Sequence, residues 1–271
     1  MNTRTRLTVL TALLVVVGVG SLSAHDTWII PSALAIRTGD AVTLNLTSGM
    51  AFPADDFAIA ATRVVRATVR IGGRTTPLGK PVAAAMALQY RWRAEREGVA
   101  TLVVDLAPRT LTLAPDKITE YLDDIDADSS TRRTWTQLAA QGHTWHESYV
   151  KHSKTFVRVG EPTSDTSWAT ANGLRLEIIP LRDPTTLRAG DTLRVRVLSN
   201  GRPMAGLSVG AIHESSTAVT FSRTNSAGEA VTTLPKAGRW LLNGTHLRRS
   251  QRAGLEWESD FTTLTLGVRV R

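Results

Sequence analysis

The segment DTLRVRVLSNG, residues 191–201, decides the fold class of this chain. Leu193, Val195 and Val197 alternate with polar or charged residues, which is the two-residue period of a strand with one buried face. The dipeptide Asn200-Gly201 follows closely, and it favours the tight turn of a β-hairpin. The segment therefore predicts a hairpin that buries one face.

The same pattern recurs on both sides of this hairpin. Val42, Leu44 and Leu46 alternate with polar residues near the start of the chain, and Gly72-Gly73 separates two short strand-like runs. Further alternating runs cover residues 174–178, 207–213, 240–246 and 264–268. Several short strands joined by turns are typical of β-sandwiches, so we expect a mainly β protein.

The period changes after residue 114. Pro115 can occupy the first turn of a helix, and the apolar residues from Ile118 to Ile125 recur at the spacing of one helix face. Asp123 and Asp124 continue the polar face of this helix, and the acidic run lacks the Gly and the terminal Glu of a calcium loop. We therefore expect a helix here rather than a calcium site.

A second helix is expected over residues 131–141, followed by a strand from Thr155 to Val159. Residues 160–172 are rich in Ser, Thr, Asp and Gly, which is typical of a linker. We expect two β-sandwich domains, Ig-like or prealbumin-like, with a helical insertion between them. The expected parts are a signal peptide over residues 1–24, an N-terminal sandwich over 25–160 with its helical segment at 115–150, a linker over 161–172 and a C-terminal sandwich over 173–271.

The first 24 residues have the pattern of a secretory signal peptide. Arg4 and Arg6 precede an apolar stretch from Leu7 to Val19, and small residues follow it. We expect the protein to be exported and to work in the periplasm or outside the cell. Because the chain has no Cys, we expect no lipid anchor at a processed N-terminus.

The cleavage position decides the new N-terminus. A break after Ala24 places His25 first, whereas a break after Ser23 fits the small-x-small pattern better and leaves Ala24-His25. A break after Leu22 would leave Ser-Ala-His, which can wrap Cu(II) or Ni(II) in a square of nitrogen ligands. Only the first break lets the α-amine and the imidazole of His25 chelate one metal ion together.

Composition excludes several classes of function. The absence of Cys excludes disulfides, thiolate zinc sites, iron–sulfur clusters and blue copper sites. The net charge of +8 comes from basic residues scattered among acids, which argues against a nucleic-acid partner. The chain has no GxSxG or HExxH motif, and we expect it not to be an enzyme.

Any metal ion must therefore be held by His, carboxylate, amine or Met ligands. His25 is the first candidate, and His246, near the end of a strand-like run, is its expected partner. Glu258 on the next segment can pair with His246 as a ligand or as a hydrogen-bond acceptor. His143 and His146 lie three residues apart, so on a helix they would share a face. For each of these histidines a purely structural role remains open.

Eight segments, taken in order and spacing, resemble one family. They are AHDTW (24–28), ITEYLDDI (118–125), ESYVKHSK (147–154), LEIIPLRDP (176–184), GDTLRVRVLSNGRPMAG (190–206), TNSAGEA (224–230), GRWLLNGTHL (238–247) and WESDFTTLTL (257–266). Together they resemble the NikM-like family of bacterial periplasmic proteins, whose domain of unknown function is associated with nickel and cobalt transport. The resemblance implies an exported two-domain β protein that handles a divalent transition metal beside a membrane transporter.

Three classes of function follow from these observations. We expect first a non-enzymatic periplasmic protein that binds a divalent metal ion (Ni, Co or Cu) or assists its uptake, with a membrane transporter or outer-membrane receptor as partner. The alternative is an envelope module that binds glycans or proteins, for which the seven Trp residues could supply stacking platforms. A copper monooxygenase with an N-terminal His ranks last, because nothing else in the sequence supports redox catalysis.

Overall fold

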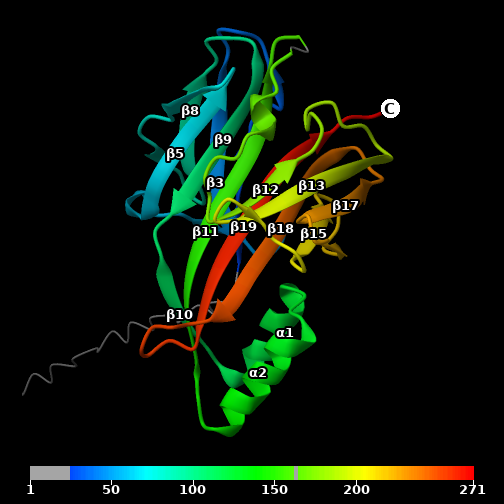
Figure 1. Ribbon diagram of the computed structural model, residues 1–271. Coiled ribbons are helices and arrows are strands. Elements are labelled where there is room, and N and C mark those ends of the chain that lie inside the picture. Colours follow the sequence, from blue (N-terminus) through cyan, green and yellow to red (C-terminus); the bar gives the residue numbers. More distant parts are fainter. Residues whose placement is uncertain (1–24, 162–163) are drawn as a thin grey trace, which may run out of the picture.

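A computed structural model describes residues 25–161 and 164–271 of the chain. The expected signal peptide, residues 1–24, lies outside the described residues. Figure 1 shows two sheet-rich lobes that meet along long central strands, with a pair of helices at one end. The protein is mainly β, with two sandwiches and a helical insertion, as the alternating pattern predicts. No helix in the described ranges is long and apolar enough to cross a membrane.

The N-terminal sandwich packs a small sheet against one half of a large sheet. The small sheet contains β1 (Asp26–Pro31), β3 (Ala41–Gly49), β4 (Phe57–Ala58), β7 (Val82–Ala83) and β8 (Leu88–Arg93). The large sheet contributes β5 (Val64–Ile71), β6 (Arg74–Pro77) and β9 (Gly98–Leu106). Val42, Leu44 and Leu46 of β3 are fully buried between the two layers, so the predicted strand and its buried face are confirmed.

The C-terminal sandwich is built in the same way on the other half of the large sheet. Its small sheet contains β12 (Leu176–Pro180), β13 (Asp191–Ser199), β14 (Arg202–Pro203) and β17 (Glu229–Leu234). The large sheet contributes β15 (Ser208–His213), β16 (Val219–Arg223), β18 (Gly238–Arg249) and β19 (Trp257–Val268). Leu193, Val195 and Val197 lie in the core of this sandwich. Asn200 and Gly201 form the predicted turn, with φ of 49° and 77°.

One pair of strands joins the two halves of the large sheet. β11 (Trp145–Val159) and β19 run parallel, in register from Glu147 opposite Trp257 to Thr155 opposite Thr265. The order across the sheet is β16-β15-β18-β19-β11-β9-β5-β6, and β2 (Ala35–Ile36) and β10 (Arg109–Leu113) also pair with β11. The two sandwiches therefore share one continuous sheet, with β11 and β19 side by side at its centre (Figure 1).

β11 is much longer than the strand predicted from Thr155 to Val159, because it begins at Trp145. Every residue of β11 is buried except His146, which is half-buried. One face packs under β1 and the helices, and the other faces the C-terminal sandwich. A strand covered on both faces shows no alternation of apolar and polar residues, and this one also carries polar side chains that pair with each other. The sequence pattern therefore missed its first ten residues.

Two helices lie between β10 and β11 and cover the end of the central strands. α1 (Pro115–Asp124) begins at Pro115 as predicted and buries Ile118, Tyr121 and Leu122 against Trp145 and Trp257. α2 (Ser129–Ala140) begins two residues before the predicted start, because the Asp128 carboxylate caps it by accepting a hydrogen bond from the Thr131 N–H at 2.7 Å.

Candidate binding cleft

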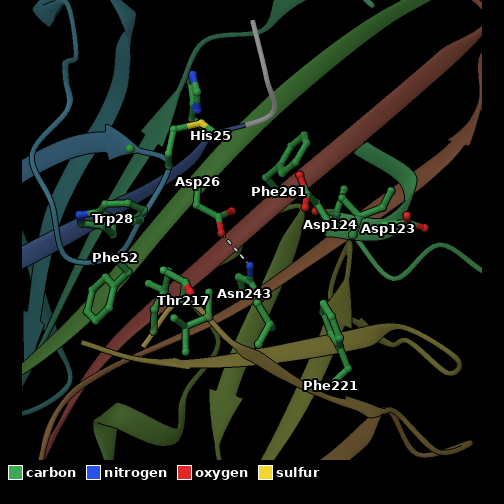
Figure 2. A pocket seen from close by; sticks show the side chains of 18 of the residues that line it. His25, Asp26, Trp28, Phe52, Asp123, Asp124, Thr217, Phe221, Asn243 and Phe261 are labelled. Atoms are coloured by element: carbon green, nitrogen blue, oxygen red, sulfur yellow. Dashed lines mark hydrogen bonds between the residues drawn. The ribbon is translucent and has the colours of Figure 1, made fainter. Parts of the chain in front are cut away.

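A cleft of about 340 Å³ lies where β1, α1 and the large-sheet strands of the C-terminal sandwich (β15, β16, β18 and β19) meet. Figure 2 shows its labelled side chains converging from these elements. β1 supplies His25 (just before its first residue), Asp26 and Trp28, and α1 supplies Asp123 and Asp124. The C-terminal sandwich closes the cleft with residues of β16, β18 and β19, among them Phe221, Asn243 and Phe261.

Polar contacts on the central strands hold β1 in place. The Asn243 amide donates a hydrogen bond to the Asp26 carboxylate at 2.7 Å, and the hydroxyls of Ser153 and Thr263 donate to the Thr27 carbonyl. The ammonium of Lys151 donates to the His25 carbonyl. Segments more than a hundred residues apart therefore fix the position of the cleft wall.

His25 lies at the mouth of the cleft. Its ring stacks on Phe57 with centroids 4.7 Å apart, and its buried Nδ1 has no hydrogen-bond partner among the described residues. Burial and the ammonium of Lys151 lower the pKa of His25, against the opposing effect of Asp56. The imidazole is therefore neutral at neutral pH, which is the form that binds transition metals.

The wall formed by β1 and α1 is acidic. Burial raises the pKa of Asp26, although its hydrogen bond from Asn243 and the charge of Lys151 oppose this effect. Burial also raises the pKa of Asp124, and the neighbouring carboxylates of Glu120, Asp26 and Asp123 raise it further. This mutual effect shows that the four carboxylates share one electrostatic environment, which favours a cation.

The remaining walls are apolar. Trp28 and Phe52 pack edge to face with ring centroids 5.5 Å apart. Phe221 on β16 is 36% exposed, and Met50 at the rim is 63% exposed. The cleft therefore combines an unpartnered imidazole, a group of carboxylates and an aromatic surface.

The structure separates His246 and Glu258 from His25. Asn243 of β18 faces β1, whereas Trp240 and Leu242 face the C-terminal core, and alternation places His246 on that second face. The residue opposite His246 on β19 is Asp260, so the expected pairing of His246 with Glu258 is wrong. Cross-strand register cannot be read from the two segments alone, which is why the sequence favoured the wrong acid.

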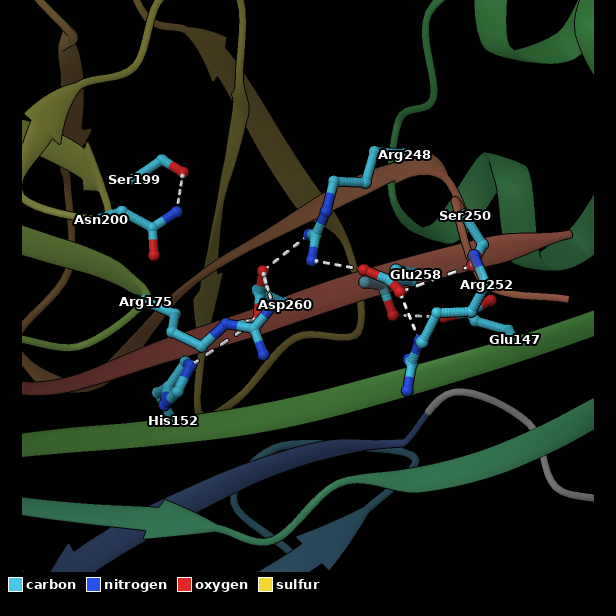
Figure 3. A network of polar contacts seen from close by, with 11 residues as sticks. Glu147, His152, Arg175, Ser199, Asn200, Arg248, Ser250, Arg252, Glu258 and Asp260 are labelled. Carbon is cyan, nitrogen blue, oxygen red and sulfur yellow. Dashed lines mark hydrogen bonds and ion pairs between the residues drawn. The ribbon is translucent and has the colours of Figure 1, made fainter. Parts of the chain in front are cut away.

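Glu258 forms ion pairs with two arginines. Its carboxylate lies 3.1 Å from Arg248 Nη2 and 2.7 Å from Arg252 Nε. Asp260 is contacted by Arg248 at 2.7 Å and by Arg175 at 3.1 Å (Figure 3). This network ties β18 and β19 to the start of the C-terminal sandwich.

His143 and His146 do not share a helix face. His143 follows α2 in a loop and hydrogen-bonds to Glu256 at 3.1 Å, whereas His146 lies in β11. Both ring nitrogens of His146 are hydrogen-bonded, one to Thr112 at 2.9 Å and the other to Thr144 at 2.6 Å. The proposed chelating pair is therefore replaced by two separately anchored rings. Within residues 25–161 and 164–271, no three His, Asp or Glu side chains are grouped as a ready metal site.

His152 belongs to a buried polar group that no sequence motif marks. His152 is 4% exposed and its Nδ1 lies 2.9 Å from Asp105 Oδ1, while its Nε2 lies 4.0 Å from Asp260 Oδ1. Figure 3 shows His152 beside Asp260 and Arg175. No local pattern could have found this group, because its members come from three strands that are distant in sequence.

The tryptophans do not form an exposed stacking platform. Trp28, Trp145, Trp240 and Trp257 are buried, and the other three rings are half-buried. Trp145 stacks on Trp257 with centroids 4.9 Å apart, beneath the helices. The four buried rings pack in the cores of the protein.

Comparison with solved structures finds remote similarity only. The D0-D1 domain of Intimin is 12% identical over 90% of this chain and 98% of that chain, with a TM-score of 0.22. A Bacteroides ovatus mixed-linkage glucan utilization protein, SGBP-B, solved with a heptasaccharide, is 12% identical over 89% of this chain and 46% of that chain, with a TM-score of 0.22. The Yersinia pseudotuberculosis adhesin InvE is 11% identical over 90% and 59%, with a TM-score of 0.24. TM-scores this low indicate no shared function.

No curated protein matches the chain. One family model does, and it covers residues 22–248, which is most of the length. That model describes a domain of unknown function, and it spans β1, the helical insertion and nearly all of β18. The chain therefore belongs to the DUF4198 family.

Proposed function

We propose that this protein is an exported, non-enzymatic binding protein that captures a divalent transition-metal ion of the nickel, cobalt or copper type for a transport system of the cell envelope. The NikM-like resemblance of the sequence supports this proposal. The signal-like first 24 residues agree with a place in the periplasm or outside the cell. The captured ion is cargo, and no catalytic step is assigned to it.

One observation carries the proposal. The buried Nδ1 of His25 has no hydrogen-bond partner among the described residues, and it belongs to a ring at the mouth of an acidic cleft. Nickel, cobalt and copper(II) prefer imidazole nitrogen, and carboxylates nearby raise the local concentration of cations. Cleavage after Ala24 would add the α-amine of His25 as a second nitrogen. His246 and Glu258, on the opposite face of the sheet, are not part of this proposed site.

Calorimetric titration of the exported, processed protein with Ni(II), Co(II) and Cu(II) tests the proposal. We expect one equivalent to bind, and we expect His25→Ala to weaken binding at least about tenfold because it removes the anchoring ligand. His143→Ala is the matched control, since His143 lies in the loop after α2 and pairs with Glu256. Equal affinity of the His25→Ala variant and the wild-type protein would refute the proposal.

An intact-mass measurement on the same preparation identifies the first residue. A mass that begins at His25 supports a chelate of amine and imidazole, whereas a longer N-terminus leaves the imidazole as the only nitrogen that residue supplies.

A further inference from the structure

We propose, on the basis of the function proposed above, that the cleft takes its metal ion as a cationic chelate. In this proposal the metal lies at His25 and a small amine-rich organic ligand fills the space between His25 and α1. The substrate class is thus a complex of a divalent metal with a polyamine-type chelator rather than the bare ion.

The size of the cleft is the first argument. Its volume of about 340 Å³ falls within the range of about 300–1,000 Å³ that is typical of small-molecule sites. In Figure 2 Asp123 and Asp124 lie to the right of His25, and Asp26 lies between His25 and Asn243. A ligand that contacts both His25 and the aspartates of α1 must therefore be larger than a single metal ion, as an organic chelate is.

The chemistry of the walls is the second argument. Trp28, Phe52 and Phe221 line the cleft and offer aromatic carbon rather than metal ligands. Trp28 and Phe52 are already buried, whereas Phe221 is 36% exposed and Met50 at the rim is 63% exposed. A bare ion would leave Phe221 and Met50 facing water, whereas the methylene groups of a chelator would bury them at about 25 cal/mol per Å² of apolar area. Aromatic faces also attract cationic groups.

The charge of the cleft is the third argument. Glu120 and Asp123 also line the cleft, but each is paired with a cation, Lys117 at 3.0 Å and Arg132 at 2.7 Å, and neither of these cations lines it. Asp26 and Asp124 line the cleft and form no ion pair within the described part of the chain. No Lys or Arg is among the described residues that line it. The cleft therefore selects a ligand of positive charge and rejects an anionic chelate.

Two nickel complexes make matched probes. Ni(II)–triethylenetetramine is a dication and Ni(II)–nitrilotriacetate is a monoanion, and both leave two coordination positions for His25, which would displace one bound water. Calorimetry on the processed full chain compares these complexes with Ni(II) alone. We expect the cationic complex to bind at least about tenfold more tightly than the anionic complex and than the bare ion.

Two variants test the walls separately. Asp124→Asn should reduce the preference for the cationic complex several-fold, whereas Asp116→Asn, on the same helix but outside the cleft, should not. Phe221→Ala should weaken the cationic complex several-fold and leave bare Ni(II) unchanged. Val231→Ala, a surface change on β17, is its control.

The outcomes separate this inference from the function on which it rests. Binding of Ni(II) alone that depends on His25, with no gain for the cationic complex, would overturn the inference and leave the proposed function standing. Equal or tighter binding of the anionic complex would also overturn the inference. If neither bare nickel nor either complex depends on His25, both proposals fail.

Discussion

Lys151 is a buried lysine with a strongly lowered pKa. Its side chain is 7% exposed, and its ammonium lies 5.5 Å from the centre of the Tyr149 ring while it donates to the His25 carbonyl. Burial lowers its pKa from 10.5 to about 8, although Asp26 and Glu147 oppose this effect. The folded state therefore disfavours the charged form of this lysine.

This shift predicts a pH dependence of stability. Above pH 10.5 the lysine is neutral in the folded and the unfolded state, so its burial does not lower the free energy of unfolding. Below pH 8 it is charged in both states, and the burial of this charge lowers the free energy of unfolding by its full amount. Because the unfolded chain binds the proton first, stability falls as pH falls through this window, by about 3 kcal/mol. Urea unfolding should show this slope in the wild type and not in Lys151→Met. Parallel profiles of the two proteins between pH 7.5 and 10.5 would contradict the assignment.

At the scale of elements, the contact between α1 and the β11–β19 pair depends on one buried carboxylate. Glu147 is fully buried and accepts hydrogen bonds from the Trp145 indole at 2.8 Å, from the Tyr121 hydroxyl at 3.0 Å and from the Ser259 hydroxyl. One residue therefore ties a helix and both central strands together.

Replacing this carboxylate should loosen the helical insertion. Glu147→Ala leaves the buried donors of Trp145 and Tyr121 unpaired, at a cost of about 1–3 kcal/mol each. We expect Tm to fall by roughly 6–12 °C for a loss of about 3 kcal/mol in a domain of this size. Ser259→Ala is the comparison, because it removes one donor and leaves the carboxylate with two. A fall in Tm no larger than that of Ser259→Ala would argue against this role, and near-ultraviolet circular dichroism would report whether the Trp145–Trp257 stack is preserved.

At the scale of the whole molecule, the two sandwiches are continuous through the β11–β19 pair. β11 has one end in the N-terminal core, where Val157 and Val159 lie, and Phe156, just before Val157, packs in the C-terminal core. Unfolding either sandwich would expose a face of this strand to water. The sandwiches are therefore expected to unfold together.

Two core variants test this coupling. Leu44→Ala opens a cavity in the N-terminal core and Leu242→Ala opens one in the C-terminal core, each at a cost of about 2–5 kcal/mol. Differential scanning calorimetry should show one transition in all three proteins, shifted downward in both variants. Two resolved transitions, each shifted only by the variant in its own sandwich, would show that the halves are independent.

Local features of the fold were readable because neighbouring residues encode them. The turns at Gly72-Gly73 and Asn200-Gly201 need positive φ at both positions, and these residue types adopt it easily. Pro115 starts α1 for an equally local reason. The alternating faces of β3 and β13 could be assigned because one side of each strand faces a core.

The residues of the candidate site could be predicted from the sequence only in part. The sequence drew attention to His25 through its place after a signal-like segment, and that residue does line the cleft. It assigned Asp123 and Asp124 only to a helix surface, and it paired His246 with Glu258 instead of Asp260. Both errors concern contacts between segments that are distant in sequence. The place of Asp123 and Asp124 depends on how α1 packs against β1, and the partner of His246 depends on the register of β18 and β19.

The sequence by itself therefore determined the β-rich class, the helical insertion, the tight turns and the buried faces of strands such as β3 and β13, because periodicity and turn chemistry act over a few residues. Only the tertiary structure decided that β11 and β19 pair in parallel to make one sheet, that β1 lies across this pair, and that His25, Asp26 and Asp124 meet at one cleft. These contacts join residues about a hundred or more positions apart. They form because packing buries the central strands on both faces, and no local pattern records that packing.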